Sequence, residues 1–138
     1  MQVFKYIFVV FMLALSHYSH AYDISVNNPR VLDGDTIDTG IVVGPTLSSL
    51  KLRIEGIDTP EMKGKCEKER MLARDAKDFL AATLKDQLVD INYHGWDKYG
   101  GRVVGVPYLH DVPMNEEMIR RGYAVPYAGG KKMKDWCK

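Results

Sequence analysis

Four carboxylates are the residues of this sequence whose types and spacing most directly indicate chemistry. Asp33 and Asp35 flank a glycine in an Asp-Gly-Asp-Thr turn, and Asp58 and Glu61 lie in an Asp-Thr-Pro-Glu turn. Crowded carboxylates repel one another unless a cation or an arginine compensates their charge. Oxygen ligands suit Ca²⁺ or Mg²⁺ rather than zinc. The two turns predict a site for a hard cation, although Asp-Gly-Asp is also a common turn sequence that needs no ligand.

Two arginines stand where they could meet the anion that such a cation would bind. Arg53 interrupts an apolar strand pattern, and Arg102 follows a Tyr-Gly-Gly turn at the start of a Val-rich stretch. A guanidinium can fork to two phosphate oxygens and stabilise charge that develops in a transition state. Structural salt bridges to nearby acids are the alternative for each arginine. Tyr99 and Tyr127 are candidates for stacking on bases or bonding a phosphate, or else are ordinary half-buried aromatics.

The two acidic turns must be held in place by neighbouring strands. Alternating apolar residues and Gly or Pro boundaries predict strands around an Asp-Gly turn in 30–37, then in 51–56, 87–93 and 102–109. The segment 38–49 reads as a hairpin or as a loop with a short strand. Pro60 restricts its own φ and favours an extended Thr59, which stiffens the second acidic turn.

Helical periodicity is clearest in 66–85, where apolar residues recur every three or four positions. Asn115 is predicted to cap a second, short helix that ends at Gly122. Residues 133–137 are expected to form a last helical turn. This order predicts a mainly β (α+β) domain with a small antiparallel barrel, which is five-stranded and of Greek-key type, and about three packed helices. An open α+β sheet is the alternative.

The N-terminus has the pattern of a signal peptide. An apolar run of about ten residues precedes small residues at positions 19 and 21. The run is shorter than the roughly 20 residues that span a bilayer. We expect residues 1–21 to be a signal peptide and residues 22–138 to form one secreted or periplasmic domain. The alternative interpretation of the apolar run is a buried core strand or helix. No cysteine directly follows the predicted cleavage site, so no membrane anchor is expected.

The sequence has two cysteines, Cys66 and Cys137. In an oxidising compartment they are expected to form a disulfide, whereas two buried free thiols are the alternative. Charge is also unevenly distributed: residues 22–62 hold 3 basic and 7 acidic side chains, and residues 98–138 hold 8 and 4. A cation-binding end and an anion-binding end would produce this asymmetry, as would chance clustering on a solvated surface.

Four strings, in this order, resemble the staphylococcal nuclease (thermonuclease) family: RVLDGDTI at 30–37, LRIEGIDTPE at 52–61, DKYGGR at 97–102, and residues 115–127. Together they extend over about 100 residues. The resemblance implies an OB-fold barrel and a calcium-dependent nuclease that acts on DNA and RNA and leaves 3′-phosphate ends. We expect a monomer.

The resemblance also implies roles for individual residues. Asp35, Asp58 and the Thr59 carbonyl would bind Ca²⁺, and Glu61 would hold or deprotonate the attacking water. Arg53 and Arg102 would bind the scissile phosphate. Asp33 would lie outside the direct metal ligands, and Lys98 and Tyr99 would help to hold a terminal phosphate.

The sequence departs from the family pattern before Arg102, where Gly100 and Gly101 replace a single glycine. The additional glycine could displace Arg102 by one residue or form a bulge. Two other functions stay open. One is a catalytically silent OB-fold that only binds nucleic acid, and the other is a calcium-stabilised interaction module. Silent relatives should lose Arg53, Glu61 or Arg102, and this chain retains all three.

Overall fold

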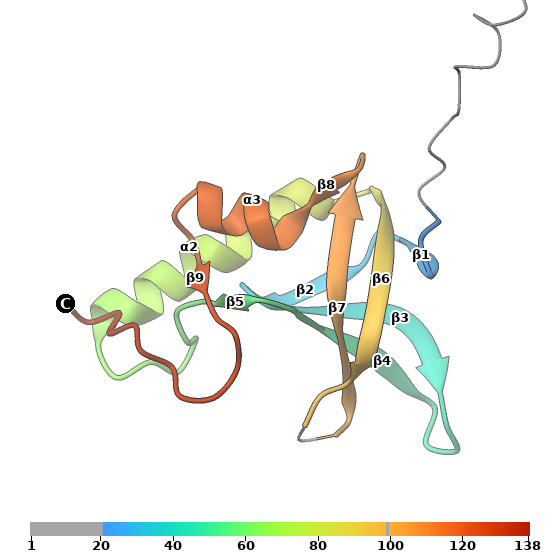
Figure 1. The fold of residues 1–138 in the computed structure, drawn as a ribbon, viewed down its shortest axis with the longest axis horizontal. Coiled ribbons are helices and arrows are strands. Elements are labelled where there is room, and N and C mark those ends of the chain that lie inside the picture. Colours follow the sequence, from blue (N-terminus) through green and yellow to red (C-terminus); the bar gives the residue numbers. More distant parts are fainter. Residues whose placement is uncertain (1–20, 99) are drawn as a thin grey trace, which may run out of the picture.

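The computed structural model describes residues 21–98 and 100–138 (Figure 1). The predicted signal peptide, apart from Ala21, and Tyr99 lie outside these residues. The described elements are β1 (Ile24–Asn27), β2 (Arg30–Asp33), β3 (Thr36–Val43), β4 (Ser48–Ile54), β5 (Ile57–Asp58), α2 (Glu67–Leu84), β6 (Leu88–Trp96), β7 (Arg102–Leu109), β8 (Val112–Pro113), α3 (Met114–Arg120) and β9 (Val125–Pro126). In this part of the chain no helix is long and apolar enough to cross a membrane.

The principal sheet is mixed and strongly curled (Figure 1). Its strands follow the order β1-β6-β7-β4-β3-β2, with β8 paired to β7, while β5 and β9 form a separate two-stranded sheet. The pair β4–β7 is parallel, so the predicted antiparallel barrel is wrong for this pair of strands. The curled half-barrel is consistent with an OB-like α+β fold. The expected count of five strands is not confirmed.

Sequence patterns locate most of the strands. The segment 38–49 is the end of β3, a turn and the start of β4, so its hairpin interpretation is confirmed. Strand β1 lies in a stretch whose mixed pattern predicts no element, and its pairing with β6 holds it in the sheet. Pro107 lies beyond the last β4–β7 pair at Gly105, where its missing N–H removes no ladder bond to β4.

Helix α2 begins and ends close to its predicted limits. Its N-cap is Cys66, whose sulfur accepts a hydrogen bond from the Glu69 N–H at 3.3 Å. Residues three or four apart in a helix share a face. The inner face of α2 joins apolar side chains of the strands and of α3 in one core, which includes Ala76, Leu80, Leu84, Ile37, Leu52, Ile54, Ile57, Ile91 and Met118.

Helix α3 differs from its prediction at the start. It begins at Met114 after Pro113, so Asn115 is not the N-cap. The Asn115 amide instead donates to the Glu55 carbonyl at 3.2 Å, which fastens α3 to the end of β4. The other end is as predicted, because Gly122 has a φ of 81° and its N–H donates to the Ile119 carbonyl.

The third predicted helix is absent from the described residues. Residues 133–135 have no regular secondary structure and residues 136–137 form a turn, so the predicted helical turn is absent. This segment crosses from β9 toward the N-terminal end of α2 (Figure 1). A disulfide joins Cys66 to Cys137, which confirms the predicted pairing over 71 residues. A covalent anchor and side-chain contacts hold the C-terminus in place of helical packing.

Candidate active site

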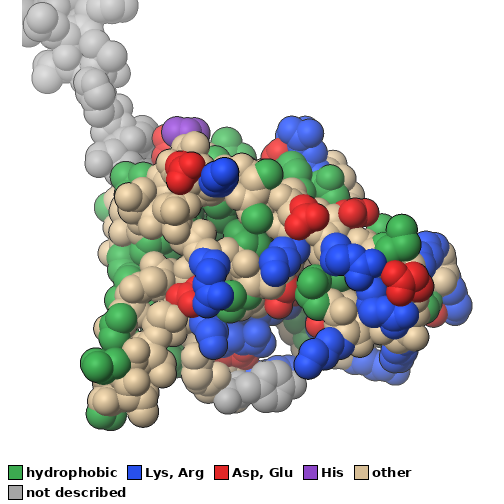
Figure 2. All heavy atoms as spheres, turned by 180° about the vertical axis from the view of Figure 1, so that it is seen from behind, with side chains coloured by type: hydrophobic (Ala, Val, Ile, Leu, Met, Phe, Trp, Pro, Cys, Tyr) green, Lys and Arg blue, Asp and Glu red, His purple; other side chains and the backbone are tan. Residues whose placement is uncertain are grey.

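Arg53 and Arg102 project from neighbouring strands to the same side of the sheet. In the parallel β4–β7 pair, Arg53 lies opposite Val104 and Lys51 lies opposite Arg102. Alternate residues of a strand share a face, so Arg102 lies on the face of Val104 and therefore of Arg53. Both arginines line one open cleft of about 880 Å³. Figure 2 shows Lys and Arg side chains gathered with Asp and Glu side chains around a hollow in this face.

Three acceptors fix the Arg53 guanidinium. Its Nη2 lies 3.1 Å from Asp35 Oδ2 and donates to the Ile57 carbonyl at 3.0 Å, and its Nη1 donates to the Ile54 carbonyl at 2.8 Å. The side chain is 12% exposed. Asp35 belongs to the first acidic turn and Ile57 directly precedes Asp58 of the second. Arg53 therefore connects the two turns. It forms the salt bridge that was the alternative interpretation of this arginine, and it also lines the cleft.

The first acidic turn is tightly packed. The Asp33 carboxylate accepts the Asp35 N–H at 3.0 Å, which holds the turn closed. A Cβ added at Gly34 would lie 3.0 Å from the Ala76 Cβ and 3.1 Å from the Thr59 Cβ. Glycine therefore permits this turn to fit between α2 and the second acidic turn. Asp33 therefore orients Asp35 by accepting the hydrogen bond from the Asp35 backbone.

Asp35 is buried beside another acid and an arginine. Burial raises the pKa of Asp35 to about 6 from its ordinary 3.8, while the charge of Arg53 acts in the opposite direction and Asp33 raises the pKa further. Because the folded-state pKa exceeds the unfolded one, folded protein binds more protons between these two values. This carboxylate therefore makes a contribution to stability that is lost as pH rises.

We expect this loss to be measurable in the metal-free protein. The free energy of unfolding of the wild type, minus that of Asp35→Asn, should fall as pH rises from about 4 to about 6 and then level off. Denaturant titrations with a chelator at several pH values would measure it. A difference that stays constant over this range would contradict the raised pKa.

The second acidic turn presents Asp58 and Glu61 differently. Asp58 and Thr59 are 3% and 2% exposed, whereas the Glu61 side chain is 61% exposed. Asp58 Oδ2 accepts a long hydrogen bond of 3.4 Å from the Trp136 indole. Asp58 Oδ1 is buried and accepts no hydrogen bond within the described residues. A buried carboxylate oxygen that accepts no hydrogen bond requires a counter-charge.

These residues fit a hard cation. Oxygen donors, the type that Ca²⁺ and Mg²⁺ prefer, come from the buried Asp58 and Asp35 carboxylates and from the Thr59 backbone. The ammonium of Lys132 lies 2.8 Å from Asp58 Oδ1 and 2.8 Å from Glu61 Oε1. Burial acts to lower the pKa of Lys132, but its contacts with Asp58 and Glu61 raise the pKa overall. A positive charge therefore already meets these carboxylates.

Arg102 lines the cleft directly after the doubled glycine. Gly100 and Gly101 have φ values of 72° and 73°, which glycine adopts without steric cost. The β4–β7 register runs without a shift from Arg102 onward, so the predicted bulge is absent there. The Arg102 Nε instead forms a short ion pair with Asp97. Arg102 therefore begins β7 in register with β4 and lies on the cleft.

Two of the three residues predicted to contact substrate lie within the described part of the chain. Lys98 and Tyr127 line the same cleft as the arginines. The Tyr127 N–H donates to the Gly56 carbonyl at 2.9 Å, and its hydroxyl donates to the Gly130 carbonyl at 2.6 Å. Tyr99 lies outside the described residues.

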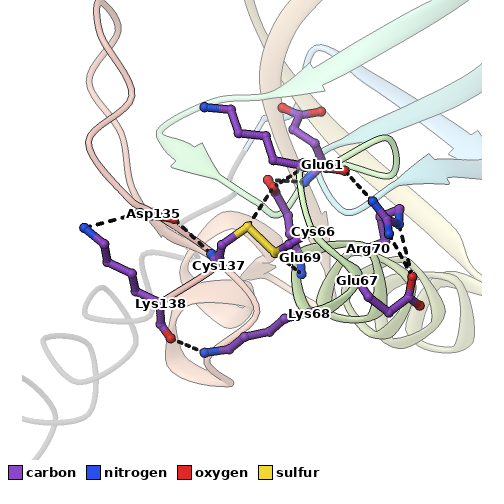
Figure 3. The surroundings of a disulfide bond; sticks show 11 residues. Glu61, Cys66, Glu67, Lys68, Glu69, Arg70, Asp135, Cys137 and Lys138 are labelled. Carbon is purple, nitrogen blue, oxygen red and sulfur yellow. Dashed lines mark hydrogen bonds and ion pairs between the residues drawn. A yellow bond between two sulfur atoms is a disulfide. The ribbon is translucent and has the colours of Figure 1, made fainter.

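Sequence reasoning missed Glu69, which supports the second acidic turn. Glu69 is 8% exposed, and its carboxylate accepts the backbone N–H groups of Glu61 at 3.3 Å and Lys65 at 3.0 Å. A Cβ at Gly64 would lie 2.4 Å from the Glu69 side chain. Figure 3 shows Glu69 beside the disulfide, with its carboxylate pointing to Cys137. An acidic residue in the first turn of the helix was the only sequence signal for this role.

Comparison with known proteins identifies the family. A family model described as staphylococcal nuclease homologue matches residues 51–136. The chain belongs to the staphylococcal nuclease family. It is similar to an uncharacterized endonuclease of Escherichia coli, at 32% identity over 106 residues that cover 76% of this chain and 62% of the relative. It is also similar to the thermonuclease of Staphylococcus hyicus, at 32% identity over 97 residues that cover 69% and 54%.

A third similar protein is endonuclease Htp3 of Saprolegnia parasitica, at 33% identity over 111 residues that cover 70% of this chain and 53% of that protein. This member of the staphylococcal nuclease family thus spans about half to three-fifths of the length of these relatives. The matched segment contains Arg53, Asp58, Glu61 and Arg102, and Asp35 precedes it.

Proposed function

We propose that this chain is a calcium-dependent nuclease that hydrolyses phosphodiester bonds of DNA and RNA. The observation that carries the proposal is the convergence of Arg53 and Arg102 on one cleft, with Arg53 ion-paired to Asp35. Two guanidinium groups beside buried carboxylates suit a phosphodiester, whose charge increases as water attacks phosphorus. The names of the relatives, endonuclease and thermonuclease, support the same chemistry.

In this proposal the chain holds calcium with Asp35, Asp58 and the Thr59 carbonyl. Bound calcium would neutralise the diester and act as a Lewis acid. Asp33 keeps the Asp35 carboxylate oriented through the N–H of that residue. Arg53 contacts Asp35 and donates to two backbone carbonyls, so its position is fixed before substrate arrives. A fixed donor needs little reorganisation during the reaction.

Glu61 is the proposed general base. Its exposed carboxylate takes a proton from water as the water oxygen bonds to phosphorus, and the bond from phosphorus to the 5′ oxygen breaks. The departing oxygen gains a proton from solvent, and the phosphate stays on the 3′ side. Arg53 and Arg102 stabilise the extra charge on the phosphate. Lys98, Tyr99 and Tyr127 are proposed to contact the substrate beyond this phosphate.

The test is cleavage of single-stranded DNA and RNA by the purified protein, in calcium or in a chelator. We expect fragments in calcium alone, and their 3′ ends should accept nucleotides from a terminal transferase only after phosphatase treatment. Binding without cleavage would favour a silent OB-fold, and calcium binding without nucleic-acid binding would favour an interaction module. Either result would overturn the proposed activity.

A conservative change tests the contribution of the arginine fork. Arg102→Lys retains the charge but loses the planar pair of donors, so kcat/KM should fall by roughly tenfold. Initial rates on a single-stranded DNA substrate would measure it. Arg120→Lys on the exposed face of α3 is the matched control and should match the wild type. Equal rates for all three proteins would remove Arg102 from the site.

We also propose that residues 1–21 are removed on export and that residues 22–138 act as a secreted or periplasmic monomer. The apolar run and the small residues at positions 19 and 21 support this processing. N-terminal sequencing of the exported protein should begin at Tyr22. Sedimentation of the same material should give the mass of one chain.

A further inference from the structure

We propose that Lys132 is a built-in counter-cation of the metal site, which calcium must displace from Asp58 and Glu61 in order to bind. This inference rests on the proposed function because it takes Asp58 as a calcium ligand. It assigns a specific role to the C-terminal segment, residues 128–137, for which the family resemblance implies no role.

The contacts of Lys132 are those of a substitute cation. Its Nζ lies 2.8 Å from an oxygen of Asp58 and 2.8 Å from an oxygen of Glu61. The Asp58 side chain is 4% exposed and that of Lys132 is 41% exposed, so a charge from the surface reaches a buried carboxylate. Asp58 Oδ1 accepts no hydrogen bond from described residues, so its compensation comes from the ion pair. A metal ion can replace that type of contact.

Two anchors hold this lysine near the carboxylates. Upstream, the Tyr127 N–H donates to the Gly56 carbonyl and the Tyr127 hydroxyl to the Gly130 carbonyl. Downstream, Cys137 is covalently bound to Cys66 at the start of α2, and Trp136 donates to the second oxygen of Asp58. The segment between the anchors is short, so the ammonium stays at high local concentration near Asp58.

Competition follows from charge. Calcium and an ammonium cannot both occupy the space beside one carboxylate oxygen without strong repulsion. Binding of calcium must therefore move the Lys132 ammonium outward, and the lost ion pairs reduce the observed affinity. Lys132 also lines the cleft that contains Arg53 and Arg102, so a displaced ammonium can remain on the cleft wall.

Calcium titration by calorimetry tests the inference on the purified exported protein. Lys132→Met keeps the length of the side chain but removes its charge, and we expect the Kd for calcium to fall roughly tenfold, equivalent to about 1.4 kcal/mol. Lys131→Met is the matched control. Lys131 is exposed and has no ion pair among the described residues, so its Kd should equal that of the wild type.

Thermal unfolding provides a second measurement that is independent of catalysis. Without metal, Lys132→Met should melt below the wild type because Asp58 and Glu61 lose their counter-charge. With saturating calcium the two melting temperatures should converge, so calcium should stabilise the variant more than the wild type.

The outcomes separate the two proposals. An unchanged or weaker affinity in Lys132→Met, with normal calcium binding by the wild type, would overturn the counter-cation role and leave the nuclease proposal standing. Failure of the wild type and of both variants to bind calcium would overturn the calcium site itself, and the inference with it. Tighter binding in both lysine variants would indicate a general charge effect and would also overturn the specific role of Lys132.

Discussion

Glu61→Gln is expected to reduce kcat by about 10²–10⁴-fold, the usual contribution of a general base. Glutamine keeps the size and polarity of the side chain but cannot accept the proton of the attacking water. The glutamate is suited to the role because its side chain is 61% exposed and therefore reaches water. Its backbone is held at the same time, since its N–H donates to the buried Glu69 carboxylate. The carboxylate of the base is thus accessible to water, while its backbone is held in place.

Single-turnover cleavage of single-stranded DNA in saturating calcium would measure this loss. Glu116→Gln makes the same chemical change at an exposed position on α3 and is expected to retain full activity. Circular dichroism and calcium titration should show that Glu61→Gln remains folded and still binds the metal. A rate within a few-fold of wild type would show that Glu61 neither activates nor positions the water, even if the chain is a nuclease.

The residues that define the acidic turns were predictable because they are close together in the sequence. Asp33 and Asp35 share one tight turn, and Pro60 stiffens the other. The two turns can also lie close together, because Gly34 permits an approach to Thr59 that a larger residue would obstruct. Strand alternation likewise indicated that Arg53 projects from a face of β4. These features follow from local backbone and packing rules.

The placement of Arg53 and Arg102 on the same face of the sheet was harder to predict from the sequence. It depends on a parallel pair between strands that are far apart in the sequence, and hairpin signals specify only antiparallel neighbours. The sequence therefore favoured an antiparallel barrel. The effect of the doubled glycine on the position of Arg102 depends on the register of this parallel pair. That register cannot be read from the sequence.

The contribution of the C-terminal segment could not be predicted from local patterns. Lys132 contacts Asp58 across 74 positions, and the sequence showed only a basic loop ending in a cysteine. The expectation of a helical turn there was wrong because the segment is held by a disulfide and by Trp136. Glu69 was missed for a related reason: burial distinguishes it from the other acidic residues of α2, and burial is a property of the folded chain.

The disulfide is the covalent basis of this arrangement, and its removal should have the second large effect. Cys66→Ala combined with Cys137→Ala opens a loop that joins residues 71 positions apart, which in the chain-entropy model costs about 4 kcal/mol of unfolding free energy. The loss of the Cys66 sulfur also removes the N-cap acceptor of α2. Denaturant unfolding of the oxidised wild type and of the double variant would measure the difference.

A matched comparison separates the covalent bond from the change in side chains. The reduced wild type keeps the Cys66 sulfur as a cap, so its unfolding free energy should lie slightly above that of the double alanine variant, and both should lie well below that of the oxidised protein. The C-terminal segment should also lose its downstream anchor, so that Lys132 spends less time at Asp58 and calcium binds more tightly to whatever fraction remains folded. Stability and calcium affinity should therefore change in opposite directions. Equal unfolding free energies with and without the disulfide would show that noncovalent contacts such as Trp136 to Asp58 are sufficient to hold the segment.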